Sequence, residues 1–465
     1  MKEVQTLGVL PLGRPTFDVA FAEEKLSAML NALAATGKTL LGPGKLLMNG
    51  AETDDAIEQI KTAAPDIVLI LQVTFTDAAA TMRIAGRFDQ PLCLWAVPEP
   101  RDGGRLRLNA FCGLNLASHA LGLNGREFSW IYADPQGAGV GAELEALLSG
   151  GRKVAPMEGE PSPADSQTGL EIAAQLNGLK IGRLGAHPDG FDTCRYDKSR
   201  LHALAGIEVD ELALQDLFDK ALTVPEIKVD HIRAAAERDL AGLEAVDQQQ
   251  LDRSLRLKAA MEIIRERGGY DAFAVRCWPE TFTEYGGAVC GPVSMMGEAH
   301  VPCACEADVY GAATQLLLQA VADAPVFLVD LVDMDAADNS GVVWHCGQAP
   351  ISMADPDAVA EATIHTNRKM PLLYQFPLKP GPVTFMRLSQ ARGRQKMIIA
   401  SGEMLKRPMA FTGTSGVVRF DRHTGDVLPD IMNSGLEHHM ALAYGEHTEP
   451  LLAAAAALDI PVIRL

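Results

Sequence analysis

Residues 300–347 begin His300-Val-Pro-Cys-Ala-Cys-Glu306-Ala-Asp308-Val-Tyr-Gly311 and continue as an apolar helical pattern to about Val321. The stretch then reads Val326-Phe-Leu-Val-Asp330-Leu-Val-Asp333-Met-Asp335 and closes with Val342-Val-Trp-His345-Cys346-Gly347. Acidic side chains within apolar segments are costly to bury unless something compensates their charge, and a divalent cation is a common compensator. Glu306 and Asp330 therefore need an explanation.

Both acids stand at predicted ends of elements. Glu306 is expected to open a helix over residues 307–321, which would place its carboxylate at the positive end of the helix dipole. Asp330 ends a β-branched apolar run typical of a parallel sheet, and α/β enzymes keep their chemistry at the carboxyl ends of such strands. The pattern predicts that the two acids face each other across a cleft. Taken singly, an acid at a helix start is usually only a cap, and one at a strand end is often a turn former.

A histidine pair far downstream is the third candidate. It lies in Asn433-Ser-Gly-Leu-Glu437-His438-His439-Met-Ala-Leu-Ala-Tyr444-Gly445, between a glycine turn and an apolar run typical of a strand. Counting back from Gly445 favours His439 as the metal ligand, whereas counting forward from the Asn-x-Gly that begins at Asn433 favours His438. The sequence therefore leaves the choice between the two histidines open. Two carboxylates and an imidazole would form a site suited to Mn²⁺ or to another divalent cation such as Mg²⁺ or Co²⁺.

These segments resemble the L-fucose isomerase and L-arabinose isomerase superfamily of metal-dependent aldose–ketose isomerases. Glu306, Asp330 and the histidine pair match, in the same order, the residues that bind Mn²⁺ in the fucose isomerase branch. Trp344-His345-Cys346-Gly347 resembles the His-Cys-Gly element of these proteins, and Leu12-Gly13-Arg14-Pro15-Thr16-Phe17-Asp18 resembles the Arg-Pro-Thr element after their first strand. The resemblance implies that Glu306 and Asp330 hold the metal and move a proton between C1 and C2 of a monosaccharide through an enediol.

Five further residues are expected to contact the substrate. Arg14 and His345 are expected to do so by resemblance, with His345 as an alternative metal ligand. The others are His187 in the turn after a predicted strand, Trp278 after another, and Asn433 before the histidine pair. Structural roles are the alternative for each: a turn histidine, a core tryptophan or a structural arginine. The substrate could be a deoxy sugar, a pentose, or an acidic or sulfonated hexose. An anionic group on the sugar would suit three arginines, Arg14, Arg183 and Arg276.

Composition limits the class of protein. The chain has 465 residues, 48% of them hydrophobic, which predicts two or three globular domains. A formal net charge of −19 argues against nucleic acid or an anionic membrane as a partner. No signal-peptide pattern opens the chain and no apolar run is long enough to span a membrane, so we expect a cytoplasmic protein with its eight cysteines reduced. Cys303 and Cys305 have poor spacing for zinc.

The order of patterns predicts an α/β protein with two doubly wound parallel-sheet domains followed by a β-rich, barrel-like domain. The expected boundaries give residues 1–155, 156–322 and 323–465, with a linker rich in turn formers over residues 151–170. The resemblance also implies that the protein assembles as a homo-oligomer, either a trimer, a tetramer or a hexamer. Two other functions remain open from the residues: a metal-dependent aldolase or hydrolase acting on a sugar, and a non-catalytic sugar-binding protein.

Overall fold

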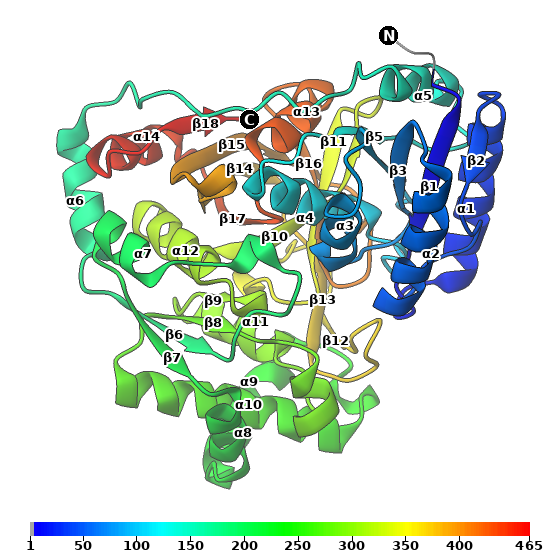
Figure 1. The fold of residues 1–465 in the computed structure, drawn as a ribbon. Helices are drawn as coiled ribbons and strands as arrows, with labels where there is room; N and C mark the ends of the chain where they lie inside the picture. Colours follow the sequence, from blue (N-terminus) through cyan, green and yellow to red (C-terminus); the bar gives the residue numbers. More distant parts are fainter. Residues whose placement is uncertain (1–3) are drawn as a thin grey trace.

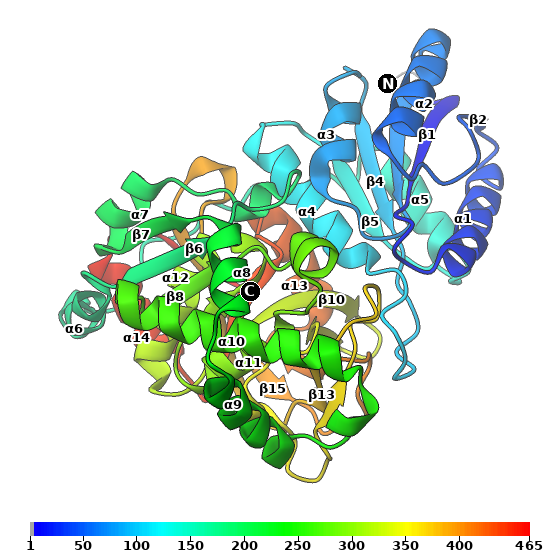
Figure 2. The same cartoon turned by 90° about the horizontal axis from the view of Figure 1, so that it is seen from below.

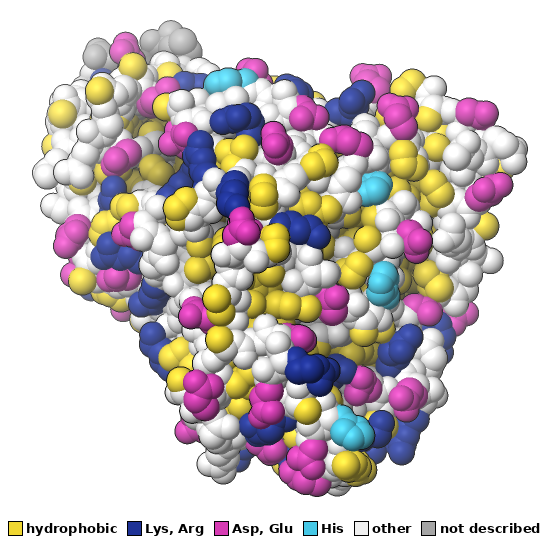
Figure 3. Space-filling view, turned by 180° about the vertical axis from the view of Figure 1, so that it is seen from behind, with side chains coloured by type: hydrophobic (Ala, Val, Ile, Leu, Met, Phe, Trp, Pro, Cys, Tyr) yellow, Lys and Arg dark blue, Asp and Glu magenta, His cyan; other side chains and the backbone are white. Residues whose placement is uncertain are grey.

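The computed structural model describes residues 4–465 and is built around three sheets that follow one another along the chain (Figure 1). The expectation that no signal peptide opens the chain concerns a stretch whose residues 1–3 lie outside the described residues. Among the residues that are described, no helix is both long enough and apolar enough to cross a membrane. On the face drawn in Figure 3, basic and acidic side chains are interspersed, with no single continuous basic patch.

The first sheet is parallel and has five strands in the order β2-β1-β3-β4-β5. Its central strands are continuous apolar runs because a parallel sheet covered by helices is buried on both faces. Apolar runs at residues 6–10, 67–71, 92–96 and 128–132 predict four strands, and the structure confirms them as β1, β3, β4 and β5. The strands are β1 (Thr6–Leu12), β2 (Thr39–Leu41), β3 (Ile67–Gln72), β4 (Leu92–Ala96) and β5 (Ser129–Tyr132), and the helices are α1 (Val19–Ala34), α2 (Gly50–Ala63), α3 (Ala78–Ala85), α4 (Ala110–Leu123) and α5 (Val140–Leu148).

The second sheet is also parallel, with the order β7-β6-β8-β9. The composition of residues 229–245, rich in Ala, Arg and Glu, predicts a single helix over that range. This prediction is wrong at its end, because α9 stops at Asp239 and Gly242 turns the chain with a φ of 76°. The strands are β6 (Lys180–Leu184), β7 (Glu208–Leu212), β8 (Ala272–Val275) and β9 (Cys303–Ala304), and the helices are α6 (Ser166–Leu176), α7 (Lys198–Ala205), α8 (Leu214–Leu222), α9 (Glu226–Asp239), α10 (Gln248–Gly268), α11 (Cys290–Glu298) and α12 (Val309–Ala322).

The third sheet has nine strands in the order β12-β13-β16-β11-β10-β17-β14-β15-β18. Most of its pairs are antiparallel, and β15 also pairs with β16, so the sheet curls towards itself. This confirms the β-rich character of the last part of the chain as a large mixed sheet. The strands are β10 (Phe327–Asp335), β11 (Ser340–His345), β12 (Glu361–Thr363), β13 (Leu373–Pro377), β14 (Gly381–Ser389), β15 (Lys396–Met404), β16 (Thr414–Phe420), β17 (His439–Tyr444) and β18 (Val462–Arg464), and the helices are α13 (Thr424–Ser434) and α14 (Thr448–Ala457).

Helices join the three sheets. α12 packs on β8 of the second sheet and on β14 and β17 of the third, so these two parts share a hydrophobic core. α4 contacts both β4 and β10 and so lies between the first sheet and the third (Figure 2). Each predicted domain contains one sheet, while the boundaries at 155 and 322 stay predictions. The three parts meet around β10, and this junction holds the site.

Candidate active site

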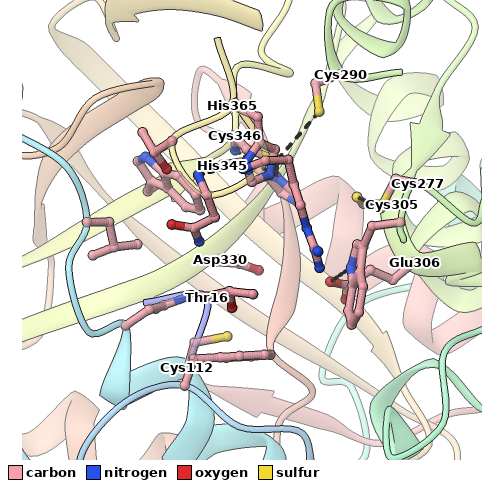
Figure 4. Close-up of a pocket in the computed structure, with 18 of the residues that line it drawn as sticks. Thr16, Cys112, Cys277, Cys290, Cys305, Glu306, Asp330, His345, Cys346 and His365 are labelled. Carbon is pink, nitrogen blue, oxygen red and sulfur yellow. Dashed lines mark hydrogen bonds between the residues drawn. The ribbon is translucent and has the colours of Figure 1, made fainter. Parts of the chain in front are cut away.

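A pocket lies where the three parts of the chain meet (Figure 4). The first part lines it with residues that include Arg14, Thr16 and Asn109, and the second with Cys277, Trp278, Cys305 and Glu306. The third part adds Asp330, Trp344, His345, Arg368 and His438. Most of the residues predicted to form a site are therefore collected from segments far apart in the sequence. This is the arrangement expected of an enzyme pocket between domains.

Strand register places Asp330 beside a histidine. Asp330 is directly opposite His439 on β17 and Trp344 on β11. Directly opposite residues on antiparallel strands project their side chains to the same face, so these three share one side of the sheet. His439 Nε2 lies 3.5 Å from Asp330 Oδ1. The prediction that Asp330 ends a strand of a parallel sheet is wrong, since it lies within β10 between two antiparallel neighbours.

Glu306 is positioned by a strained turn rather than by a helix start. Its backbone is left-handed, with a φ of 57° and a ψ of 24°, and Ala307 also has a positive φ. α12 begins only at Val309, and its cap is Asp308, which accepts a hydrogen bond from Gly311 N. The expectation that Glu306 opens this helix is therefore wrong. Left-handed non-glycine residues cost free energy and persist where the surrounding structure holds them, often at functional sites.

The turn directs the Glu306 carboxylate into the pocket. Its Oε1 accepts a hydrogen bond from Trp278 Nε1 at 3.1 Å, and His438 Nε2 lies 2.8 Å from its Oε2 (Figure 4). Burial alone would raise the pKa of Glu306, but the hydrogen bond and the positive charge of His438 outweigh it and lower the pKa. Glu306 is therefore held as a carboxylate, ready to accept a proton or to bind a cation.

The two adjacent histidines have different environments. Glu306 raises the pKa of His438 against the opposing effect of burial, so His438 is favoured as an imidazolium. Burial and the neighbouring charge of His438 lower the pKa of His439, which stays neutral. Only a neutral imidazole has a nitrogen lone pair free to bind a metal. On this ground His439 is the better candidate ligand of the pair.

His439 does not itself line the pocket, and Asp308 fixes which of its nitrogens is left for Glu306 and Asp330. Its Oδ2 lies 2.9 Å from His439 Nδ1, so that nitrogen donates its hydrogen to the carboxylate and Nε2 is left as the acceptor. The fully buried Arg387 contacts Asp308 with two hydrogen bonds, of 2.6 and 3.1 Å. This arginine and His439 hold the pKa of Asp308 far below its usual range against the effect of burial. Sequence reasoning assigned no role to Asp308.

The ligand atoms fit a divalent cation. Two sets of side chains have possible ligand atoms within 4.8 Å of one another: Cys194, Glu306, His438 and His439 form one, and Asp330, His345 and His439 form the other. His439 is common to both, and its Nε2 lies 3.9 Å from Glu306 Oε2. Asp330 Oδ1 is buried and has no hydrogen-bond partner within the described part of the chain, as expected of an atom reserved for a ligand.

Among the described residues no single set contains both carboxylates, because Glu306 turns towards His438. A cation held by Glu306, Asp330 and His439 together would therefore require one carboxylate to rotate into the space between them. Two carboxylates and one imidazole are the donors that Mn²⁺, Mg²⁺ and Co²⁺ accept. Cys194 is a less suitable ligand, since burial raises the pKa of its thiol well above the usual value.

The structure separates the predicted substrate residues into two groups. Arg14, Trp278 and His345 line the pocket, and His345 Nε2 is buried without a hydrogen-bond partner. His187 and Asn433 do not line it. Asn433 lies in α13, where its Oδ1 accepts a hydrogen bond from Ala155 N at 2.8 Å, which gives it a structural role. His187 is half-buried in the segment that follows β6.

Several pocket residues carried no signal that sequence reasoning used. Arg368 has no motif around it, and its position depends on how a loop packs. Cys277 and Cys305 face each other with 2.6 Å between their sulfur atoms, although 28 residues separate them. All eight cysteines are free, which agrees with the reduced thiols expected from the sequence.

Comparisons with known proteins give the family. Residues 8–157 match the model described as the N-terminal domain of fucose/sulfoquinovose isomerase, and residues 343–465 match the C-terminal domain of L-fucose isomerase. The sulfoquinovose isomerase of Priestia megaterium is 31% identical over 457 residues, which cover 98% of each chain. Those of Clostridium sp. and Alkalicoccus urumqiensis are 31% and 28% identical, each over 99% of both chains.

A solved structure of an ABC transporter solute-binding protein from Burkholderia multivorans covers 70% of this chain and 95% of its own, with 9% identity and a TM-score of 0.20. So low a score carries no argument about fold or function. The family matches, by contrast, extend over both ends of the chain and set aside the aldolase, hydrolase and binding-protein alternatives. The chain belongs to the fucose/sulfoquinovose isomerase family and is an aldose–ketose isomerase.

Proposed function

We propose that this isomerase depends on a divalent cation held by Glu306, Asp330 and His439, with Mn²⁺ as the first choice. When bound, such a cation polarises the sugar carbonyl and stabilises the negative charge that develops on oxygen as the C2 proton leaves. The observation that supports the proposal is the position of His439 Nε2, which lies within 4 Å of an oxygen of each carboxylate. Asp308 holds His439 in the tautomer that binding requires.

We assign the proton transfers to the same two carboxylates. Glu306 is ionised, because hydrogen bonding to His438 lowers its pKa, so it can accept the proton from one carbon. Asp330, on a different element and with an unpaired Oδ1, can exchange a proton at the other carbon. Trp278 keeps Glu306 in place through its indole N–H. The intermediate between the two transfers would be an enediol, which exchanges hydrogen with solvent.

Loss of either carboxylate tests this assignment. Glu306→Gln and Asp330→Asn should each lower turnover at least about a thousandfold, as removal of an essential acid or base commonly does, while leaving the protein folded. Asp335→Asn is a suitable control, because this residue lies on the same strand outside the pocket. Turnover of Glu306→Gln close to that of the wild type, in the presence of metal, would refute the assignment.

For the substrate we propose sulfoquinovose, a glucose derivative with a sulfonate in place of the hydroxyl on C6. Four similar proteins bear the name sulfoquinovose isomerase, and Arg14 in the pocket would suit an anionic group. The test is whether the protein converts sulfoquinovose to a ketose of equal mass, with the conversion monitored by nuclear magnetic resonance. Absence of conversion by the metal-loaded protein would contradict the proposal. A homo-oligomeric assembly and a cytoplasmic location stay predictions.

A further inference from the structure

We propose that Arg14 and Arg368, whose guanidinium groups both lie beside the Trp278 ring, together form a clamp for the sulfonate of the substrate. This inference rests on the proposed function, because it names the residues that would recognise the proposed substrate. Of the three arginines that the sequence offers for an anion, Arg14 lines the pocket, and Arg183 and Arg276 do not. Arg368 lines the pocket as well.

Trp278 contacts both Glu306 and the two arginines of the clamp. Its indole N–H donates to Glu306 at 3.1 Å. The guanidinium carbons of Arg14 and Arg368 lie 5.0 and 5.6 Å from the centre of its ring system. Both distances are within the range of a cation–π interaction, so the ring helps to hold two cations near each other. A sugar whose C1 and C2 lie beside Glu306 would extend along Trp278 and present its far end to the two arginines.

The positive charges of Arg14 and Arg368 are incompletely balanced by nearby carboxylates. Arg14 contacts Asp77 at 3.4 Å, and Asp77 also caps α3 by accepting a hydrogen bond from Ala79 N. For Arg368, no carboxylate lies within ion-pair distance among residues 4–465. Burial, and then the nearby charge of Arg14, lower the pKa of Arg368. Two guanidinium groups that repel each other in a half-buried pocket are stabilised by an anion placed between them.

A separate arginine fixes the spacing of the clamp. Arg105 donates to the carbonyl of Thr16 at 2.7 Å and to Asn367 Oδ1 at 2.7 and 3.1 Å. Thr16 is two residues from Arg14, and Asn367 precedes Arg368, so Arg105 ties together the two loops that carry the clamp. One loop comes from the first part of the chain and the other from the third. The clamp is therefore arranged before a ligand arrives, which lowers the entropic cost of binding.

The charge count favours a sulfonate over a phosphate. At the clamp itself, Arg14, Arg368 and Asp77 leave one net positive charge, which a singly charged sulfonate would neutralise and a doubly charged phosphate would exceed. Arg105 is left out of this count because it does not line the pocket and its guanidinium donates to Thr16 and Asn367. A sulfonate also offers three oxygens, enough for both planar guanidinium groups to donate hydrogen bonds in pairs. A sulfonate is the anion of a strong acid and carries its single charge throughout the neutral pH range. The site therefore predicts a preference for sulfoquinovose over the same sugar without the sulfonate and over glucose 6-phosphate.

The experiment compares three sugars on four proteins. Initial rates are measured for sulfoquinovose, quinovose and glucose 6-phosphate with the metal-loaded wild type and with Arg14→Gln, Arg368→Gln and the control Arg83→Gln. Arg83 is an exposed arginine paired with Asp54 at 2.6 Å, away from the pocket. Each clamp variant should lower kcat/KM for sulfoquinovose by about 10- to 100-fold, as loss of a charge-assisted hydrogen bond does, and leave kcat/KM for quinovose within about twofold.

An equal loss with sulfoquinovose and quinovose would overturn the clamp, since the arginines would then act on the fold or on the reacting end of the sugar. A wild type that prefers quinovose or the phosphate would overturn it as well. Calorimetric titration of sulfoquinovose into Glu306→Gln, with and without Arg368→Gln, separates the clamp from the proposed function. If no sugar is isomerised but Arg368→Gln still abolishes binding, the function fails and the clamp stands. Unchanged binding overturns the clamp.

Discussion

Replacement of Asp308 by asparagine should weaken both the fold and the metal site. Asparagine is a good helix cap and can keep the hydrogen bond to Gly311 N. It loses the nearer of the two negative charges that balance the fully buried Arg387; the other is Glu437, whose Oε2 lies 3.8 Å from Arg387 Nε. It also ceases to act as an anionic acceptor for His439 Nδ1, so the imidazole is no longer held with Nε2 as the free nitrogen.

The magnitudes follow from the two contacts. Breaking a buried ion pair by removing one partner costs about 3 to 5 kcal/mol of unfolding free energy. Losing the carboxylate that orients a metal-binding histidine lowers metal affinity by about 10- to 100-fold. Urea unfolding followed by circular dichroism measures the first effect, and calorimetric titration with Mn²⁺ measures the second. Asp247→Asn, at the cap of α10, is the matched control and should change neither quantity.

A second variant separates the two effects. Adding Arg387→Met and Glu437→Gln to Asp308→Asn removes the whole buried charge cluster, because Glu437 is the other carboxylate beside Arg387, at 3.8 Å. Stability should then recover by at least about 2 kcal/mol, because an apolar or neutral replacement of buried charges is often close to neutral. Mn²⁺ affinity should stay low, since His439 still lacks its anionic partner. If Mn²⁺ affinity recovers together with stability, Asp308 does not act through His439 and the reasoning is refuted.

Three further results are expected. His439→Asn should abolish measurable Mn²⁺ binding, whereas His438→Asn should keep Mn²⁺ affinity within about tenfold and lower turnover, and the reverse order would contradict the assignment of the pair. Trp278→Phe removes the hydrogen bond to Glu306 but keeps a ring beside the arginines, so kcat should fall about tenfold with an unchanged melting temperature. Burial raises the pKa of Glu99 from 4.5 to about 8, so the folded state keeps a proton that the unfolded state releases near pH 4.5. The free energy of unfolding should therefore fall as the pH rises from 4.5 to 8, by at most about 5 kcal/mol from this group. Urea unfolding at several pH values measures this dependence, and Glu99→Gln should remove it. A pH dependence that is the same in Glu99→Gln as in the wild type would contradict the prediction.

The first sheet and the two acids could be predicted from the sequence because their signals are local. Runs such as the one over β3 are buried on both faces and stay apolar throughout. Asp330 is conspicuous for the same reason, as a charge within an apolar strand. The error at Glu306 was a question of capping: aspartate is a much better N-cap than glutamate, so Asp308 marks the helix start, and the left-handed turn before it has no sequence signature.

The rest of the site depends on contacts between distant segments. The pairing of Asp330 with His439 is a matter of strand register in a nine-stranded sheet, which periodicity does not reveal. Arg368 enters the pocket because Arg105 ties its loop to the first part of the chain. Asn433 lies next to the right segment in sequence, but α13 directs it towards Ala155. Local chemistry found candidate residues, and packing decided which of them meet.

The central claim is that Glu306 and Asp330 move a proton between two carbons of the sugar at a cation held with His439. Isomerisation in heavy water tests it most directly, with nuclear magnetic resonance used to locate deuterium in the sugar. The account predicts deuterium at C1 or C2 with the metal-loaded wild type, and none above background with Glu306→Gln or Asp330→Asn. A wild-type product that retains all of the substrate's carbon-bound hydrogen would indicate a hydride shift and contradict the claim.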